Sequence, residues 1–257
     1  GSEGPVLITV PHCGIRFPRE LKGQYDQQLI RKPDDTDWFV DRLYDFAPSL
    51  GMTMVAAMYS RWVIDLNRDP CDKALYSDGR IITGLCPVTD FLGNDLYLDR
   101  RKQVDEKEVK KRLERYYWPY HSEIQRQLGR LKEKFGKVLL WDCHSIRQNV
   151  PTIQKEKFPD LILGSSDGRS ASEEIIDCAL KNLSSGTYQL SHNHPFKGGF
   201  ITRSYGRPGE NVHALQLEMT KINYMDDNEL SYDVTRSEKI RSLLRDTLTT
   251  VTEIILP

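Results

Sequence analysis

Short hydrophobic runs alternate with amphipathic segments along the chain. β-Branched and aliphatic residues fill five runs, each of which we expect to be a strand: Pro5 to Val10, Met52 to Met58, Lys137 to Trp141, Leu161 to Leu163 and Val212 to Met219. Apolar residues spaced three or four positions apart predict helices near residues 35–46, 105–134, 171–182 and 237–252. Because strands alternate with helices, we predict a three-layer α/β/α fold around a mainly parallel, mixed sheet.

Individual residues set several helix boundaries. Thr36 is expected to cap the first helix, which places Asp37 in its first turn. Pro119 predicts a kink or a break in the long, charged second helix. Ser170 and Glu173 predict a capping box at the start of the third helix.

Polar residues follow several of the strand-like runs directly. Trp62 to Leu66 also reads as a strand, so Asn67 and Arg68 are expected at a strand end. His12 and His144 take the same kind of position after two of the buried runs. Ligand-binding residues commonly lie at strand ends in α/β folds, and we therefore expect a functional site there.

Two other regions carry weaker patterns. Residues 69–99 lack periodicity and contain many turn-forming residues, which makes this long irregular segment a candidate lid. The last third of the chain predicts a short strand near Tyr188 to Leu190 and an apolar stretch from Phe200 to Thr202 after a glycine turn.

Length and charge limit the class of protein. The 257 residues suffice for one large α/β domain, which we expect over residues 4–257, while Gly1 and Ser2 resemble a cloning scar. Lysine and arginine total 36 against 37 aspartates and glutamates, a formal net charge of −1. This balance provides no global field to attract nucleic acid or an anionic membrane. No stretch approaches the roughly 20 apolar residues of a membrane span.

Cysteine usage indicates a reducing compartment. Five cysteines form no C-x-x-C pair, in a chain too large to need disulfides for stability. We therefore expect reduced thiols and a cytoplasmic location. Cys13 and Cys143 adjoin histidines, but a catalytic cysteine is disfavoured because neighbours in an extended chain point to opposite sides. The sequence carries no pattern that predicts an oligomeric state.

Histidines and an aspartate form a candidate metal site. A catalytic zinc ion uses three protein ligands and a water, and two imidazoles with one carboxylate are a common set. His12, Asp37 and His144 satisfy this requirement. From spacing alone, ordinary hydrogen-bonded histidines explain the pattern equally well.

Two motifs resemble those of a known superfamily. The chain carries Asp65-Leu66-Asn67-Arg68 and, later, Asp142-Cys143-His144-Ser145. This order is similar to that of the zinc carboxypeptidases and acylamino-acid deacylases, in which a D-x-H-S element provides a zinc histidine and a D-L-N-R element binds substrate. The resemblance implies a fold of the zinc-peptidase type.

Four segments resemble the N-formylglutamate amidohydrolases more closely, and the resemblance runs from residue 5 to about 226: Val10 to Gly14, Ser60 to Arg68, Lys197 to Thr202 and Ala214 to Met219. It implies hydrolysis of N-formyl-L-glutamate to formate and L-glutamate, a step of histidine degradation, with one Zn²⁺ ion. Two alternatives stay open: a deacylase for succinyl, acetyl or other N-acyl acidic amino acids, and a catalytically silent small-molecule binding protein.

The second metal ligand departs from the superfamily pattern. The superfamily's first ligand motif is H-x-x-E, whereas no acidic residue follows His12 at that spacing. The family resemblance implies an aspartate that opens the next helix, which selects Asp37. Four other carboxylates remain open: Glu20, Asp34, Asp35 and Asp41.

Glu218 is the candidate catalytic carboxylate. It lies in the middle of a predicted strand and shares a strand face with Gln216. A carboxylate on a sheet face costs free energy unless it is paired or functional, and a solvated or salt-bridged glutamate is the ordinary alternative. The family resemblance implies that Glu218 is the general base and acid.

Five polar residues are candidates for binding substrate: Arg61, Asn67, Arg68, Arg203 and His194. The guanidinium group matches a carboxylate through two parallel hydrogen bonds, and glutamate carries two carboxylates. A surface salt bridge is the commoner role for each arginine taken singly. Arg68 has the best support, from the D-L-N-R motif, and His194 with His192 forms a candidate pocket pair that a plain loop role explains equally well.

Overall fold

Six strands form one sheet in the part of the chain that the computed structural model describes, namely residues 2–73, 83–99 and 104–256. The strand order is β2-β1-β3-β6-β4-β5, with bounds Val6–Val10 (β1), Thr53–Ala56 (β2), Val138–Ile146 (β3), Leu161–Gly164 (β4), Leu190–His192 (β5) and Val212–Thr220 (β6). The first four strands in this order are parallel, whereas β4 pairs antiparallel with β6 and parallel with β5. The predicted mainly parallel, mixed sheet is therefore confirmed.

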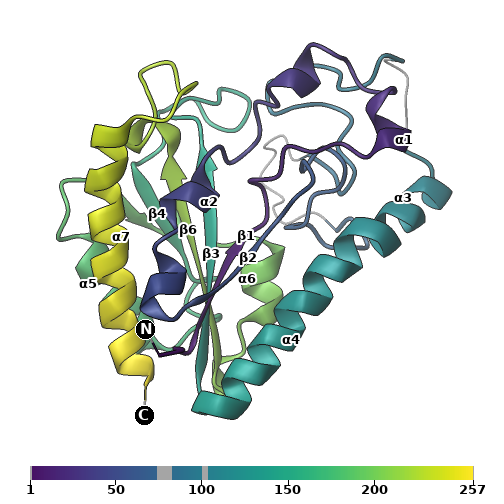
Figure 1. Cartoon of the computed structure of the whole chain (residues 1–257). Coiled ribbons are helices and arrows are strands. Elements are labelled where there is room, and N and C mark those ends of the chain that lie inside the picture. The colour runs from purple at the N-terminus through teal and green to yellow at the C-terminus, as the bar shows by residue number, and fades with distance from the viewer. Residues whose placement is uncertain (1, 74–82, 100–103, 257) are drawn as a thin grey trace.

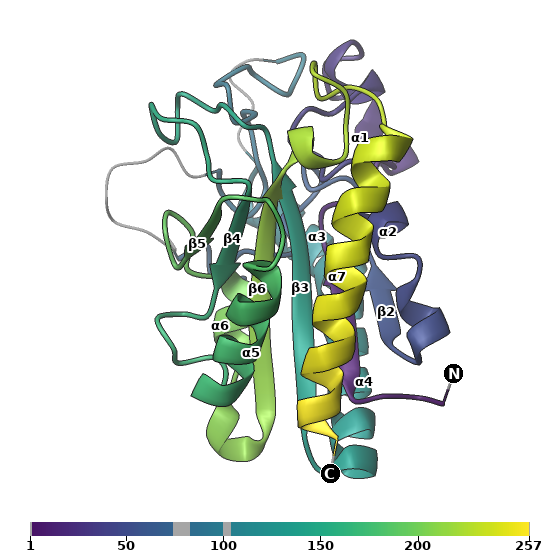
Figure 2. The same cartoon turned by 90° about the vertical axis from the view of Figure 1, so that its left-hand side faces the viewer.

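Helices cover both faces of the sheet and complete the predicted three layers (Figure 1). One face packs against α2 (Val40–Leu43), α5 (Glu173–Leu183) and α7 (Val234–Ile255). The other face packs against α4 (Trp118–Phe135) and α6 (Phe200–Tyr205). Figure 2 shows α7 and α5 in front of the sheet. Shorter helices lie at Arg19–Lys22 (α1), Leu29–Arg31, Ala47–Leu50, Pro208–Glu210 and Lys221–Asn223.

The central strands are buried on both faces. Every residue of β1, β3 and β6 is buried, which explains why their sequences are nearly continuous hydrophobic runs. Side chains alternate between the two layers: Val6 and Ile8 pack on the α7 side, and Leu7 packs on the α4 side. The polar residues of these strands therefore need partners or a cavity.

The long charged helix consists of three consecutive segments. α3 spans Glu106–Arg112, a π-helical segment spans Leu113–Tyr117, and α4 follows directly. Pro119 lies in the first turn of α4 and has no N–H to donate to the preceding turn. The interruption predicted at this proline therefore takes the form of a π-helical segment. We call residues 106–135 the helical rod.

Residues 62–66, predicted as a strand, form an irregular buried segment. Side chains of the helical rod, rather than a neighbouring strand, bind its carbonyl groups and that of Arg68. The three donations are Arg112 to Val63 at 2.9 Å, His121 to Leu66 at 2.9 Å and Tyr117 to Arg68 at 2.8 Å. A buried backbone needs hydrogen-bond partners but not a strand, so the hydrophobic run gave the wrong assignment.

The first predicted helix begins later than expected. α2 starts at Val40, because the preceding Phe39 has a left-handed φ of 63°. Thr36 does not cap it, and Asp37 lies in the loop before it rather than in its first turn. The position of Asp37 is therefore set by loop contacts.

Three further boundaries differ from the prediction. α5 begins at Glu173 without the predicted capping box, because the hydroxyl of Ser170 donates to the carbonyl of Ala214 at 2.7 Å. The apolar stretch after Gly199 forms α6. β3 continues to Ile146, so the D-x-H-S motif lies within the strand.

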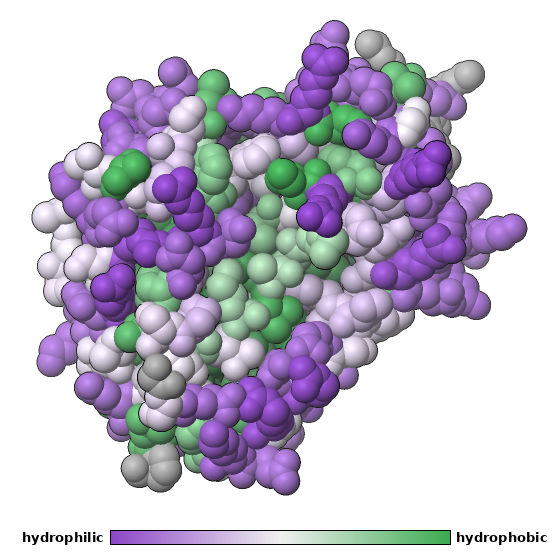
Figure 3. Space-filling model, viewed as in Figure 1, coloured by the Kyte–Doolittle hydropathy of each residue, from purple (hydrophilic) through white to green (hydrophobic). Residues whose placement is uncertain are grey.

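The surface seen in Figure 3 has apolar residues in its middle and polar residues around them. Ile15 and Met58 are among the exposed large hydrophobic residues. No helix in the described part of the chain is long and apolar enough to cross a membrane. Of the predicted lid, residues 74–82 lie outside the described part.

Candidate metal centre and substrate cavity

A cavity opens where β1, β3 and β6 end side by side. Parallel neighbours bring their carboxyl ends to one edge of the sheet, and the register pairs His144 of β3 directly with Glu218 of β6. The empty space is about 670 Å³, counted with its open mouth. Its wall consists of His12, Asp37, Arg61, Asp65, Asn67, Arg68, Phe91, His144, Ser145, Ile146, Ile153, Phe196, Gly199, Gln216 and Glu218.

His12, Asp37 and His144 converge at the floor of this cavity. All three are buried, and each offers one potential ligand atom within 4.8 Å of the others. The Nδ1 atoms of His12 and His144 lie 3.5 and 3.1 Å from Oδ2 of Asp37. Nδ1 of His12 and Oδ1 of Asp37 are buried and make no hydrogen bond within the described residues. Two imidazole nitrogens and a carboxylate are a donor set that fits a divalent cation such as zinc.

The backbone fixes Asp37 beside the first histidine. The N–H of Asp37 donates to the carbonyl of His12 at 3.0 Å, which joins the loop before α2 to the loop after β1. Three alternative carboxylates make other contacts: Glu20 binds Arg115, Asp34 binds Arg147, and Asp35 binds Trp62. Of the carboxylates open to the sequence argument, Asp37 is the one in the group of potential ligands.

Two further carboxylates orient the histidines from behind. Asp65 accepts from Nε2 of His12 at 2.7 Å, and Asp142 lies 2.9 Å from Nε2 of His144. A carboxylate on Nε2 keeps a proton on this nitrogen, so Nδ1 is the ring nitrogen that faces Asp37 and that can bind a metal ion once it has lost its own proton. Asp65 and Asp142 are the first residues of the two motifs quoted above. The sequence analysis assigned neither of them a role, although their position in these motifs could have indicated one.

Charges within the group shift pKa values in opposite directions. Burial alone would lower the pKa of His144, but Asp142 and Asp37 outweigh this effect and raise it well above its ordinary value. Burial likewise opposes the ionised form of Asp37, but His12 and His144 hold its pKa below the ordinary value. The site therefore favours anionic carboxylates facing positive charge.

Glu218 stands beside this group on β6. It is 9% exposed, and Nε2 of Gln216 donates to its Oε2 at 3.4 Å. The amide of Gln216 is oriented because its Oε1 accepts from the N–H of Gly199 at 2.7 Å. Burial raises the pKa of Glu218 to about 8, although His144 opposes the shift. The predicted shared face of Glu218 and Gln216 is present in the structure.

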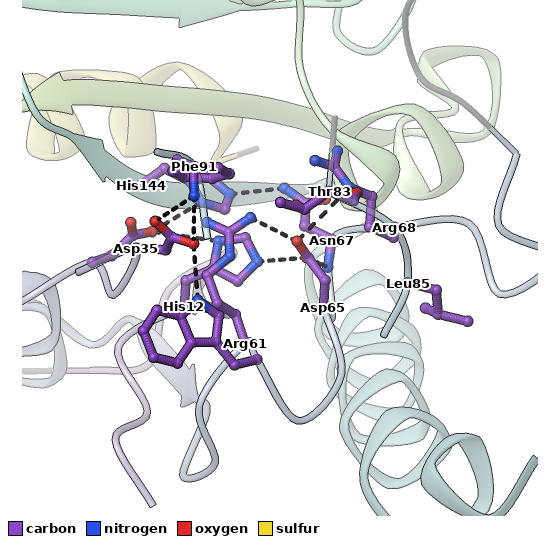
Figure 4. Close-up of polar contacts among 12 residues, drawn as sticks. His12, Asp35, Arg61, Asp65, Asn67, Arg68, Thr83, Leu85, Phe91 and His144 are labelled. Atoms are coloured by element: carbon purple, nitrogen blue, oxygen red, sulfur yellow. Dashed lines mark hydrogen bonds and ion pairs between the residues drawn. The ribbon is translucent and has the colours of Figure 1, made fainter. Parts of the chain in front are cut away.

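Two of the predicted arginines reach the cavity (Figure 4). Arg61 is buried, and its Nη2 donates to Oδ2 of Asp65 at 2.6 Å. Arg68 is half-buried and donates from Nε to the carbonyl of Thr83 at 2.9 Å. Both cations lie near Asp65, at 2.6 and 3.8 Å from its Oδ2. The cavity therefore combines a carboxylate-rich floor with a cationic wall.

Asn67 joins the two halves of the site. Its Nδ2 donates to Oδ2 of Asp142, the partner of His144, at 3.4 Å, and its Oδ1 accepts from the N–H of Ile201 at 2.8 Å. A Cβ on Gly199 would lie only 2.3 Å from Nδ2 of Asn67, so this close approach requires glycine. Asn67 thus positions its neighbours as well as lining the cavity.

Two predicted substrate residues lie elsewhere. Arg203 is half-buried and donates from Nε to the carbonyl of Gly198 at 2.8 Å. His194 is exposed. Neither is among the described residues that line the cavity, and His192 lies beside Ser165 instead.

Comparisons with known proteins agree with the sequence motifs. A family model described as N-formylglutamate amidohydrolase matches residues 4–225. An N-formylglutamate deformylase of Pseudomonas putida is 42% identical over 227 residues, which are 88% of this chain and 83% of that protein. One of Pseudomonas aeruginosa is 41% identical over 247 residues, 95% of this chain and 91% of that protein.

Solved structures share the fold. The N-formylglutamate amidohydrolase of Ralstonia eutropha JMP134 superposes with a TM-score of 0.79 at 27% identity, covering 99% of this chain and 94% of that chain. A gene product of Agrobacterium tumefaciens superposes with a TM-score of 0.71 at 17% identity, covering 97% and 92%.

Proposed function

We propose that this chain, which belongs to the N-formylglutamate amidohydrolase family, hydrolyses the amide bond of N-formyl-L-glutamate to formate and L-glutamate. The observation that carries the proposal is the convergence of His12, Asp37 and His144 beside Glu218 in one cavity. We place this reaction in histidine degradation and in the cytoplasm, as the sequence led us to expect.

The two Nδ1 atoms and the carboxylate of Asp37 are the proposed ligands of one Zn²⁺ ion. Zinc bound there supplies Lewis-acid polarisation of the formyl carbonyl and of the attacking water. Asp65 and Asp142 hold the two imidazoles in the ligating tautomer.

Glu218 is the proposed proton carrier. Its carboxylate takes a proton from the attacking water as the C–O bond forms, and the same carboxyl gives a proton to the leaving nitrogen as the C–N bond breaks. The pKa near 8 that burial gives it supports this exchange close to neutral pH. The atoms of water are thereby divided between formate and the released amine.

The different burial of Arg61 and Arg68 suggests a different role for each. Arg61 is bound to Asp65, which contacts the ligand His12, so the charge of Arg61 lies next to the metal group and suits the developing oxyanion. Arg68 is the more exposed of the two and suits a substrate carboxylate. The roles predicted for Arg203 and His194 have less support, because neither lines the cavity in the described part of the chain.

Metal analysis combined with a formate-release assay tests the proposal. We expect Glu218→Gln to retain zinc and lose turnover by about 10²- to 10⁴-fold, and Asp37→Ala to lower the zinc content. Glu229→Gln is the matched control, because Glu229 is also 9% exposed but lies outside the cavity wall. Full activity of Glu218→Gln, or activity that survives thorough chelation, would refute these roles.

A further inference from the structure

Hydrogen bonds from the N–H of Phe91 and to its carbonyl hold this residue in the cavity wall. It belongs to no helix or strand, yet its N–H lies 3.1 and 3.2 Å from the two carboxylate oxygens of Asp35. Its carbonyl accepts a hydrogen bond from the hydroxyl of Thr152. Two segments distant in sequence therefore fasten one residue of an otherwise irregular loop.

Asp35 is itself anchored. It is 5% exposed, and its Oδ2 also accepts from Nε1 of Trp62 at 2.8 Å. Hydrogen bonds to an ionised acceptor are stronger than those between neutral groups, so this carboxylate is an effective clamp. It joins the loop before Asp37, the segment that carries Arg61 and the loop that carries Phe91.

The clamp places the Phe91 ring on a functional cation. The guanidinium carbon of Arg61 lies 4.7 Å from the centre of the ring, within the range of a cation–π contact. Arg61 binds Asp65, and Asp65 binds the ligand His12 (Figure 4). The ring therefore covers the cation that stands next to the proposed metal group, and it lines the same cavity.

The chemistry of an acyl group then relates Phe91 to the substrate. The group that distinguishes formyl from acetyl or succinyl is bonded to the same carbon as the carbonyl oxygen. If Arg61 holds that oxygen, as in the function proposed above, this group is the immediate neighbour of the bound oxygen and lies close to Arg61 and to the ring that covers it. A hydrogen needs almost no space there, whereas a methyl group needs a pocket.

We propose that Phe91 is the residue that restricts this site to formyl substrates, and that Asp35 and Thr152 position it. The inference rests on the proposed function, because it uses the role given to Arg61. This role of Phe91 would distinguish a deformylase from a deacylase with larger acyl substrates, the alternative that the sequence left open.

The test compares kcat/KM for N-formyl-, N-acetyl- and N-propionyl-L-glutamate in the wild type and in Phe91→Ala. Adding or removing one methyl group in an apolar pocket changes kcat/KM by about 10- to 200-fold. We therefore expect the formyl-to-acetyl ratio to fall by about 10-fold or more in Phe91→Ala. If the ratio stays within twofold of wild type while both activities fall together, Phe91 contacts another part of the substrate and the proposal is wrong.

Control variants separate selection from general damage. Phe196→Ala removes another phenylalanine of the cavity wall, one that stacks on Phe158 at 5.4 Å, and is expected to leave the ratio unchanged. Asp35→Ala should lower the ratio as Phe91→Ala does, and Asp35→Asn, which keeps an acceptor oxygen, should restore part of it. Phe91→Leu keeps an apolar side chain and should give an intermediate ratio if Phe91→Ala does not fold.

Failure of this inference can be told from failure of the proposed function. A wild type that hydrolyses acetyl and formyl substrates equally well would overturn the role of Phe91 and leave deformylation standing. A wild type that hydrolyses none of the three would overturn the function. Calorimetric binding of N-formyl- and N-acetyl-L-glutamate would then decide on Phe91, since equal affinity ratios in wild type and Phe91→Ala would reject it.

Discussion

Asp65→Asn keeps the shape of a buried side chain and removes its charge. Asp65 is 0% exposed, and its two oxygens accept from Nε2 of His12 at 2.7 Å and from Nη2 of Arg61 at 2.6 Å. An asparagine offers one oxygen and one NH₂ group, so one of these donors would face another donor. Either the imidazole or the guanidinium therefore loses its acceptor.

The magnitude follows from the burial of Arg61. Removing one partner of a buried ion pair costs about 3–5 kcal/mol, and we expect about 3 kcal/mol because Arg61 reaches the cavity. In a chain of this size each kcal/mol lowers Tm by about 2–4 °C, so Tm should fall by about 6–12 °C. Loss of the carboxylate behind the proposed ligand His12 should also lower zinc affinity by about 10- to 100-fold.

Thermal unfolding of the metal-free protein and zinc competition with a chelator measure the two effects separately. Asp142→Asn is the matched control, because Asp142 contacts His144 at 2.9 Å and Thr9 at 2.7 Å but no arginine in the described part of the chain. We expect it to lose zinc affinity equally and to lose less Tm. Equal Tm losses in the two variants, or zinc affinity of Asp65→Asn within twofold of wild type, would refute the reasoning.

Three other predictions use different contacts. Burial lowers the pKa of His121 to about 4. An unfolded histidine titrates near about 6.5 and then binds the extra proton, so the free energy of unfolding should fall by up to about 3 kcal/mol as pH drops between these values. Denaturant titrations at pH 7 and 4.5 should show a smaller fall in His121→Gln, and an equal fall would contradict this. Gly199→Ala forces a Cβ against Asn67 and should lower the free energy of unfolding, measured by calorimetry, by about 1–3 kcal/mol. An unchanged Tm would show that the surrounding residues move to accommodate the methyl group. Arg68→Lys loses the planar fork and should raise KM for N-formyl-L-glutamate by about 10-fold with a smaller change in kcat, so an unchanged KM would remove Arg68 from substrate binding.

The positions of site residues within regular strands were the easiest to predict from the sequence. His144 and Glu218 lie in β3 and β6, whose hydrophobic runs predict buried strands, and the motifs around them indicated a site. Pairing of the two strands then brings the residues side by side. Local pattern and family resemblance were sufficient for this part because both depend on short stretches of sequence.

Residues held by tertiary contacts were harder to assign. Asp37 is placed by a bond from its N–H to the carbonyl of His12, and only the family resemblance selected it among several carboxylates. Phe91 is placed by Asp35 and Thr152, which are 56 and 61 positions away. No periodicity encodes such contacts, because they depend on how distant loops meet after the sheet has formed.

Three carbonyl groups of the segment from Val63 to Arg68 accept hydrogen bonds from side chains of the helical rod. We therefore expect this segment to move together with the rod. A sliding or tilting of the rod on the sheet would carry Arg68 with it, and so would change the distance from this arginine to Glu218 on β6. The buried Leu128 belongs to the hydrophobic cluster between α4 and the sheet, so we expect core residues of this kind to influence the position of the rod and, through it, the width of the cavity. The size of substrate that the enzyme admits can therefore be altered by repacking hydrophobic side chains far from the chemistry.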